Sequence, residues 1–139
     1  MKAITLTQPW ASLVALGAKR IETRSWSTSY RGQLAIHAGK TFPRWARELA
    51  RSKEFLNAPE VRALLEAGFQ YPRGVVIATC DLYSCVETDK IDRFVKLTDQ
   101  EESFGDYSPR RFAFLLDNVR VLPEPVPASG ALGLWEWNA

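Results

Sequence analysis

The sequence predicts an α+β domain of the mixed, barrel-like kind. Segments of strand character recur along the chain, a short helix pattern follows the first of them, and a helical hairpin is inserted before the middle strand. At 139 residues the chain has the usual length of one domain, and its hydrophobic content of 46% is ample for a core. Neither internal repeats nor low-complexity tracts compete with this prediction. We therefore expect one domain over residues 1–139.

The N-terminal part alternates between strand and helix patterns. Residues 2–6 have strand character. The short helix that follows is predicted to have Thr7 as its N-cap, Pro9 in its first turn and Gly17 at its end. After a charged segment and a polar turn, residues 33–38 form a further predicted strand.

A change of period at Thr41 predicts helices. Apolar residues recur there at helical spacing, which places Trp45 in the core, and a second helix is predicted between an Asn57 cap and a stop at Gly68. Aromatic residues at regular spacing are mostly core residues. The same reasoning assigns three more tryptophans to the core: Trp10, Trp135 and Trp137.

The C-terminal half returns to strand patterns. Residues 75–81 predict a central strand, residues 111–122 another and residues 132–137 the last, with three prolines imposing an extended connection before it. Residues 87–109 are acidic and weakly periodic. We expect a long loop there, with one turn of helix starting at Thr98 and acidic side chains directed to solvent.

Composition narrows the class of protein. No apolar run is long enough to span a bilayer and the N-terminus lacks the apolar stretch of a secretory signal, so we expect a cytoplasmic protein with no membrane partner. Cys80 and Cys85 have opposite strand parity and form no pattern with the single His37, which predicts two reduced thiols. Because no His, Cys, Asp and Glu cluster has ligand spacing, we predict no metal site and no cofactor.

The net charge of +2 hides an uneven distribution of charge. Residues 1–53 hold ten basic and two acidic side chains, whereas residues 54–139 hold eight and fourteen, so that the two parts carry +8 and −6. Such asymmetry favours a surface for a polyanion in the N-terminal part. The alternative is that the two parts intermingle in space and pair their charges.

The most informative segment is G-x-K-x-x-E-x-R over residues 17–24. If its second half is a strand, alternation places Glu22, Arg24 and Trp26 on one face. Lys19 falls at the joint between helix and strand, where parity says nothing about its direction. The same alternation is also typical of a solvated strand face, on which ion pairs contribute about 0–1 kcal/mol each.

The motif and its flanks resemble the ASCH domain family, the cointegrator-homology branch of the PUA-like superfamily. The flanks are Gln-Pro-Trp-Ala-Ser at residues 8–12, Arg-Ser-Trp at 24–26 and Tyr-Arg-Gly at 30–32. The resemblance is strong over residues 4–40 and continues through strand order and the ending at 130–137. It implies a PUA-like β-barrel in which the motif lines a cleft that accepts nucleic acid or a nucleoside.

A non-catalytic nucleic-acid-binding module, directed to RNA, is the function we favour from the residues and the resemblance. Lys19 and Arg24 are expected to contact phosphate, and Trp26 or Trp10 to stack on a base. Further contacts are expected from the following turn and from the arginine-rich helix: Tyr30, Arg31, Arg44, Arg47 and Arg51.

A metal-independent hydrolase in the same cleft is the alternative. Lys19 would stabilise developing negative charge and Glu22 would act as general base or acid, aided by His37, although a lone histidine is also typical of a core position. The substrate would be an RNA phosphodiester or an acylated nucleoside such as acetylcytidine. ASCH-fold amidohydrolases have a threonine three residues after the motif lysine, where this chain has Glu22. Thr23 is predicted on the opposite strand face, which counts against an amidase.

A protein-interaction module, whose basic surface receives an acidic partner, is the third function open to the sequence. Competition by short RNA would separate it from a nucleic-acid-binding module, because both would depend on salt. The sequence makes no prediction of oligomeric state or of RNA against DNA, because no motif specifies base edges and no apolar stripe marks a dimer surface.

Overall fold

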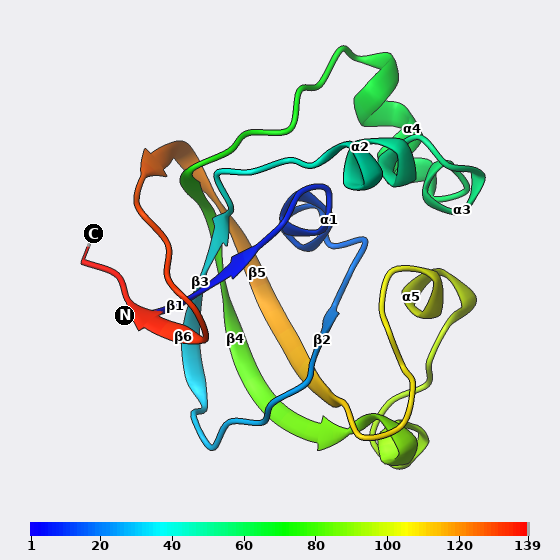
Figure 1. Cartoon of the computed structure of the whole chain (residues 1–139), viewed down its shortest axis with the longest axis vertical. Helices are drawn as coiled ribbons and strands as arrows, with labels where there is room; N and C mark the ends of the chain where they lie inside the picture. The colour runs from blue at the N-terminus through cyan, green and yellow to red at the C-terminus, as the bar shows by residue number, and fades with distance from the viewer. Residues whose placement is uncertain (139) are drawn as a thin grey trace.

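The computed structural model describes residues 1–138 and shows a mixed α+β fold on one curled sheet of six strands (Figure 1). The strands are β1 (Lys2–Leu6), β2 (Ile21–Arg24), β3 (Gly32–Ala38), β4 (Val75–Glu87), β5 (Phe112–Pro127) and β6 (Leu134–Glu136). They lie in the order β2-β5-β4-β3-β1-β6, which places β2 and β6 at the two edges of the sheet. The sheet curls into a half-barrel (Figure 1). β1 and β3 are parallel, and the other neighbouring strands are antiparallel. The predicted fold class is confirmed.

The first helix lies over the sheet and fills the half-barrel (Figure 1). This helix, α1 (Trp10–Ala15), contributes Ala11 and Val14 to the main core. They join Leu34 and Ile36 from β3 and Phe114 from β5, all of them buried. Packing of its apolar stripe holds α1 on the sheet. It therefore also positions the charged segment that connects α1 to β2.

Three short helices follow β3 and form the inserted layer. They are α2 (Arg44–Ala50), α3 (Lys53–Leu56) and α4 (Pro59–Glu66). Phe55 of α3 and Val61 of α4 belong to a second core cluster, which also contains Leu13 of α1 and Phe104. Phe104 directly follows α5 (Asp99–Ser103). This cluster therefore joins the inserted helices to a segment almost fifty residues later.

The start of α1 differs from the prediction. Thr7 is not the N-cap, because the helix begins at Trp10 and Pro9 occupies the cap position. The carboxamide of Gln8 takes over the capping role: its Oε1 accepts a hydrogen bond from the Ser12 N–H at 3.0 Å. Its Nε2 donates to Ser12 Oγ and to the Pro72 carbonyl, both at 2.8 Å. Two residues of the Gln-Pro-Trp-Ala-Ser flank thus serve the fold.

The inserted hairpin has three helices where two were predicted. α2 begins at Arg44 because Pro43 is extended, and Ser52 is extended again between α2 and α3. Asn57 ends α3 and does not cap the next helix. The cap position of α4 is Ala58, which is followed by a proline at the first helical position. The prediction therefore placed helices in this region but missed the break at Ser52 and the cap position of the last helix.

β4 and β5 are longer than the sequence predicts, whereas β6 is shorter than the predicted strand at 132–137. β4 and β5 pair along their length with several register shifts, so the proline-rich connection is part of β5. These prolines are tolerated because, among the described residues, β2 pairs with β5 only as far as Leu115. Residues 87–109 also hold more structure than expected, since they contain η1 (Thr88–Arg93) before α5. The predicted start of α5 is confirmed, because Thr98 Oγ1 accepts from the Glu101 N–H.

Candidate functional site

The turn between α1 and β2 buries the lysine of the motif. Gly17 has φ of +78°, which lets the chain reverse, and the N–H groups of Ala18 and Lys19 both donate to the Leu13 carbonyl. The Lys19 side chain is completely buried. Its ammonium donates to the carbonyls of Ile21 at 2.5 Å and Phe104 at 3.3 Å. Lys19 therefore links the start of β2 to the end of α5.

Glu22 and Arg24 lie together on one face of β2, as alternation predicts. The Arg24 Nη2 atom is 2.8 Å from Glu22 Oε2, and its Nε donates to the same oxygen at 3.0 Å. The other carboxylate oxygen of Glu22 is 3.6 Å from Lys19 Nζ. The three charged residues of the motif thus form one chain, with buried Lys19 at one end and half-buried Arg24 at the other.

A buried carboxylate that the sequence did not predict binds the main chain at the start of β2. Glu101 was expected to face solvent, but only 8% of it is exposed. Its carboxylate accepts hydrogen bonds from the N–H groups of Arg20 and Ile21 at 2.9 and 3.0 Å. Burial raises the pKa of Glu101, and the two N–H donors and nearby Lys19 oppose that rise. Glu101 thereby fixes α5 against the first residues of β2.

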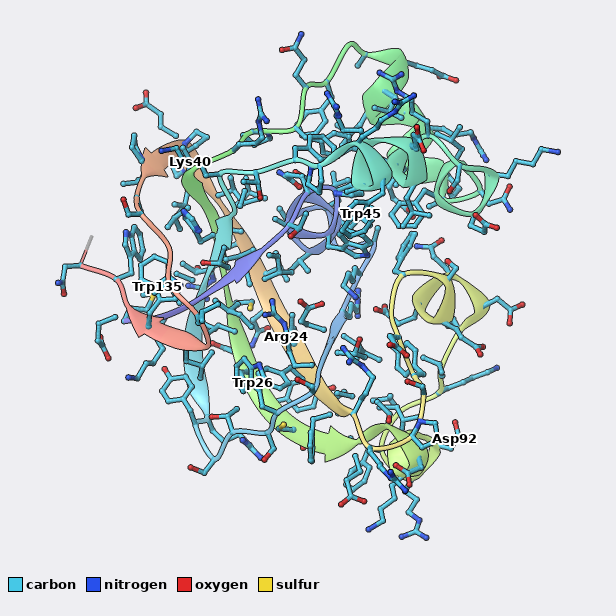
Figure 2. All side chains as sticks on the ribbon, in the orientation of Figure 1. Arg24, Trp26, Lys40, Trp45, Asp92 and Trp135 are labelled. Carbon is cyan, nitrogen blue, oxygen red and sulfur yellow. The ribbon has the colours of Figure 1, made fainter. Side chains whose placement is uncertain are left out.

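Glu22 and Arg24 form one wall of a cleft of about 650 Å³. Trp10 and Trp45 line another part of it, with ring centroids 5.8 Å apart. The Trp10 indole N–H donates to the Phe104 carbonyl at 2.9 Å, so this ring is fixed. Trp45 is 60% exposed and lies on α2 beside α1 (Figure 2). The lining of the cleft therefore includes both an exposed aromatic ring and an ion pair.

The assignment of Trp45 to the core is wrong. Because α2 has only seven residues and starts at Arg44, its buried face is made by Ala46 and Ala50. Trp45 then lies at the edge of that face and borders the cleft together with Leu49. Nothing in the period of the sequence distinguishes this placement from a core position.

Residues after α5 complete the cleft and were also missed. Asp106 and Arg111 line it, and Arg111 Nε is 3.5 Å from Asp106 Oδ2. Thr23 borders the cleft as well, where its Oγ1 accepts from the Asp106 N–H at 3.1 Å. The charged side chains of the lining are thus two arginines and two carboxylates, each arginine paired with a carboxylate.

Three other predicted site residues lie apart from this cleft. Trp26 packs edge-on against Phe114 of the core, with ring centroids 5.1 Å apart, and does not line the cleft. The Tyr30 hydroxyl donates to the Gln33 carbonyl, and exposed Arg31 donates to carbonyls of its own turn. These contacts hold the turn between β2 and β3.

The arginines of α2 lie on its exposed side. Arg44, Arg47 and Arg51 line a separate shallow hollow with Glu48, which pairs with Arg44 at 3.0 Å. They share the helix with Trp45 but do not line the cleft that Trp45 borders. They can therefore contact only parts of a ligand that extend beyond the cleft.

His37 belongs to a second hollow, of about 1110 Å³. The ring is 2% exposed, and its two nitrogens contact Thr5 Oγ1 at 3.1 Å and the Ala128 carbonyl at 2.8 Å. Trp135 packs edge-on against it and donates to the same Thr5 hydroxyl. His37 is therefore bound to protein groups on both nitrogens and does not line the cleft at Glu22.

Two kinds of feature were searched for over residues 1–138. None of the helices there has the length and apolar character needed to cross a membrane. Within the same residues, no three His, Cys, Asp or Glu side chains are grouped so as to hold a metal ion.

Residues 4–123 match the family model of the ASCH domain. The chain belongs to the ASCH domain family. Activating signal cointegrator 1 from Homo sapiens is 30% identical to it over 141 residues, and so is the protein of the same name from Mus musculus. Each match covers 98% of this ASCH domain but only 22% of the cointegrator, so the chain spans about a fifth of the length of these relatives.

Solved ASCH structures show the same fold. The crystal structure of ASCH from Zymomonas mobilis superposes with a TM-score of 0.51 at 15% identity, covering 91% of this chain and 72% of the other. A mutant of that protein gives a TM-score of 0.50 with 74% of its chain covered. The family is PUA-like and is linked to RNA binding.

Proposed function

We propose that this ASCH domain binds single-stranded RNA and that the cleft beside Glu22 and Arg24 receives a nucleobase. The observation that carries the proposal is the exposed ring of Trp45 in the same cleft as the Glu22–Arg24 pair. An exposed aromatic ring offers a stacking surface worth about 1–3 kcal/mol per base. A carboxylate and a guanidinium beside it supply an acceptor and donors for a base edge.

The charges of the cleft favour a base over a phosphate. Arg24 and Arg111 are each paired with a carboxylate, so the lining offers no excess positive charge. Lys19 lies behind Glu22 with no exposed surface, and its ammonium is held by two carbonyls. The proposal therefore leaves out the direct phosphate contact expected of Lys19, and gives Arg24 the edge of a base.

The test is binding of a 3′-fluorescein-labelled single-stranded RNA, measured by anisotropy. Trp45→Ala is expected to weaken binding by about 5- to 160-fold, the equivalent of one lost stacking contact of about 1–3 kcal/mol. Phe94→Ala removes another ring that is 56% exposed and serves as the matched control. Equal affinities of the two variants, or no binding by the wild-type domain at low salt, would overturn the proposal.

A metal-independent hydrolase is the second candidate, and the observation in its favour is Glu22. Its carboxylate lines the cleft while Lys19 and Arg24 lie against its two oxygens, which positions one carboxylate to act as a general base or acid toward a substrate. The same samples are read on a denaturing gel. RNA cleavage that Glu22→Gln abolishes would establish a nuclease, whereas intact RNA with retained binding supports the binding module.

A protein partner is tested by competition. The cointegrator relatives carry a name that refers to signalling, and their ASCH segment is a fifth of their length. An acidic peptide of equal net charge is added to the complex of the domain with labelled RNA. Displacement by unlabelled RNA but not by the peptide supports the proposal, and the reverse supports a protein-interaction module.

A further inference from the structure

The second hollow differs from the cleft in its charges. It is bordered by the end of β3, by the turn before β4 and by the segment after β5, and no carboxylate lines it. Its two charged residues are Lys40 and Arg73, both exposed. Within residues 1–138 neither makes an ion pair or a side-chain hydrogen bond. This hollow thus carries two uncompensated positive charges, whereas the cleft carries none.

The floor of this hollow is fixed by hydrogen bonds. His37 bridges the Thr5 hydroxyl and the Ala128 carbonyl, and Trp135 donates to Thr5 from the other side. Gly130 lies so close that a Cβ atom there would be 2.8 Å from His37 Nδ1. The segment after β5 therefore rests directly on the histidine, and the hollow is formed before any ligand arrives.

The two hollows adjoin each other. Thr5 at the end of β1 and Thr7 after it line both of them. Arg24 lines the cleft and Lys40 lines the second hollow, and Figure 2 shows the two side chains well apart on the domain. A single strand that places a base beside Arg24 and continues past Thr5 and Thr7 would therefore reach the hollow with Lys40.

We infer that the hollow with Lys40 and Arg73 is a phosphate subsite for the strand whose base occupies the Arg24 cleft. The inference rests on the proposed function and adds the position of the phosphate contacts. Two free cations without a nearby carboxylate match a phosphodiester or a terminal phosphate, whereas the paired charges of the cleft do not. Base and phosphate are thus recognised in separate, adjoining places.

The test compares two double variants that remove the same charge. Lys40→Gln with Arg73→Gln changes the subsite, and Arg93→Gln with Lys96→Gln removes two exposed cations in and just after η1. Figure 2 shows Lys40 and Asp92, the neighbour of Arg93, on opposite sides of the domain. Anisotropy of an eight-nucleotide RNA with a 3′ fluorescein is measured from 0.05 to about 0.3 M salt, with circular dichroism to check folding.

The slope of log affinity against log salt concentration is negative, and each phosphate contact on a single strand contributes about −0.7 to it. Because the subsite variant loses two such contacts, its slope is expected to be shallower than that of the wild type by about 1.4. At about 0.1 M salt this corresponds to a roughly 10- to 30-fold loss of affinity. Trp45→Ala weakens binding without changing the slope, since it removes no charge. The two kinds of contact are therefore separated by the salt dependence.

Two forms of the RNA identify the source of the phosphate. A loss shared by RNA with a 5′ hydroxyl and with a 5′ phosphate indicates a backbone phosphodiester, and a loss confined to the 5′ phosphate form indicates a terminal phosphate. Either result supports the subsite. If each form of the RNA has the same affinity and salt slope with the subsite variant as with the η1 control, the inference is overturned while the proposed function stands. If the wild type binds neither form, both are overturned.

Discussion

The guanidinium of Arg24 on β2 donates a hydrogen bond of 2.9 Å to the main-chain oxygen of Thr5 on β1. Three strands separate β2 from β1 in the sheet, so this bond crosses the half-barrel and does not follow a strand ladder. The same guanidinium pairs with Glu22. Arg24 therefore borders the cleft and also holds its two sides at a fixed separation.

Replacing Arg24 should destabilise the domain as well as weaken RNA binding. Arg24→Ala leaves the Thr5 carbonyl and one oxygen of Glu22 without their partner, which is expected to lower the free energy of unfolding by about 2 kcal/mol. Urea unfolding measures this. Arg31→Ala is the control, because exposed Arg31 bonds only to its own turn, and it should change the free energy by less than about 0.5 kcal/mol. Equal losses in both variants would contradict a bridging role for Arg24.

Glu101 makes stability depend on pH. Its pKa is raised above the ordinary 4.5 by burial, so between that value and its pKa in the fold the folded state binds more protons than the unfolded state. The free energy of unfolding contributed by Glu101 must therefore fall as pH rises through that window and stay constant above it. Urea titrations of wild type and Glu101→Gln from pH 4 to 8 check this. A difference between the two proteins that does not change with pH would disprove the assignment.

The hydroxyl of Tyr107 is buried and has no hydrogen-bond partner within residues 1–138. Burial raises the pKa of Tyr107, and the carboxylates of Glu101 and Glu22 add to the rise, so the group stays neutral. Because an unpaired buried hydroxyl costs about 1–3 kcal/mol, Tyr107→Phe should stabilise the domain by about 1 kcal/mol in thermal unfolding. Tyr30→Phe loses a formed bond to Gln33 and should have the opposite sign. A destabilised Tyr107→Phe would show that the hydroxyl has a partner in solution.

Gly130 should tolerate no side chain. A Cβ atom there would overlap the ring of His37 and the hydroxyl of Thr5, so Gly130→Ala is expected to cost about 1–3 kcal/mol and to weaken RNA binding by displacing the wall of the second hollow. Gly39 lines the same hollow, but a Cβ atom there meets its neighbours at 3.4 Å or more. Gly39→Ala should leave the melting temperature within a few degrees of wild type. The prediction fails if the two alanine variants have the same melting temperature.

Local patterns predicted the parts of the fold that depend on one element. Strand alternation placed Glu22 and Arg24 on one face, and the turn of helix predicted to start at Thr98 is α5, with Thr98 as its N-cap. Gly17 marks the end of α1 because a left-handed residue is required there. Each of these features is decided within a few residues of the chain.

The features that the sequence did not predict depend on distant partners. The donors to Glu101 lie 80 and 81 residues away, and one of the carbonyls that bury Lys19 lies 85 residues away. Trp45 is exposed because Ala46 and Ala50 make the buried face of the short helix α2. Periodicity within one segment carries no information on such contacts, so the cleft residues beyond the motif could not be found from it.

The burial of Lys19 affects what can be inferred about ligand binding when two proteins share this motif. Its ammonium is occupied by internal carbonyls, and Gln8 and Ser12 of the flanking segment are buried and bonded to each other. These positions secure the scaffold, while the groups open to a ligand, such as Trp45, Lys40 and Arg73, lie outside them. A match between two chains at these buried positions therefore predicts a shared shape and does not by itself predict a shared ligand. Differences in what ASCH domains bind should be sought in the rim residues that surround this constant frame.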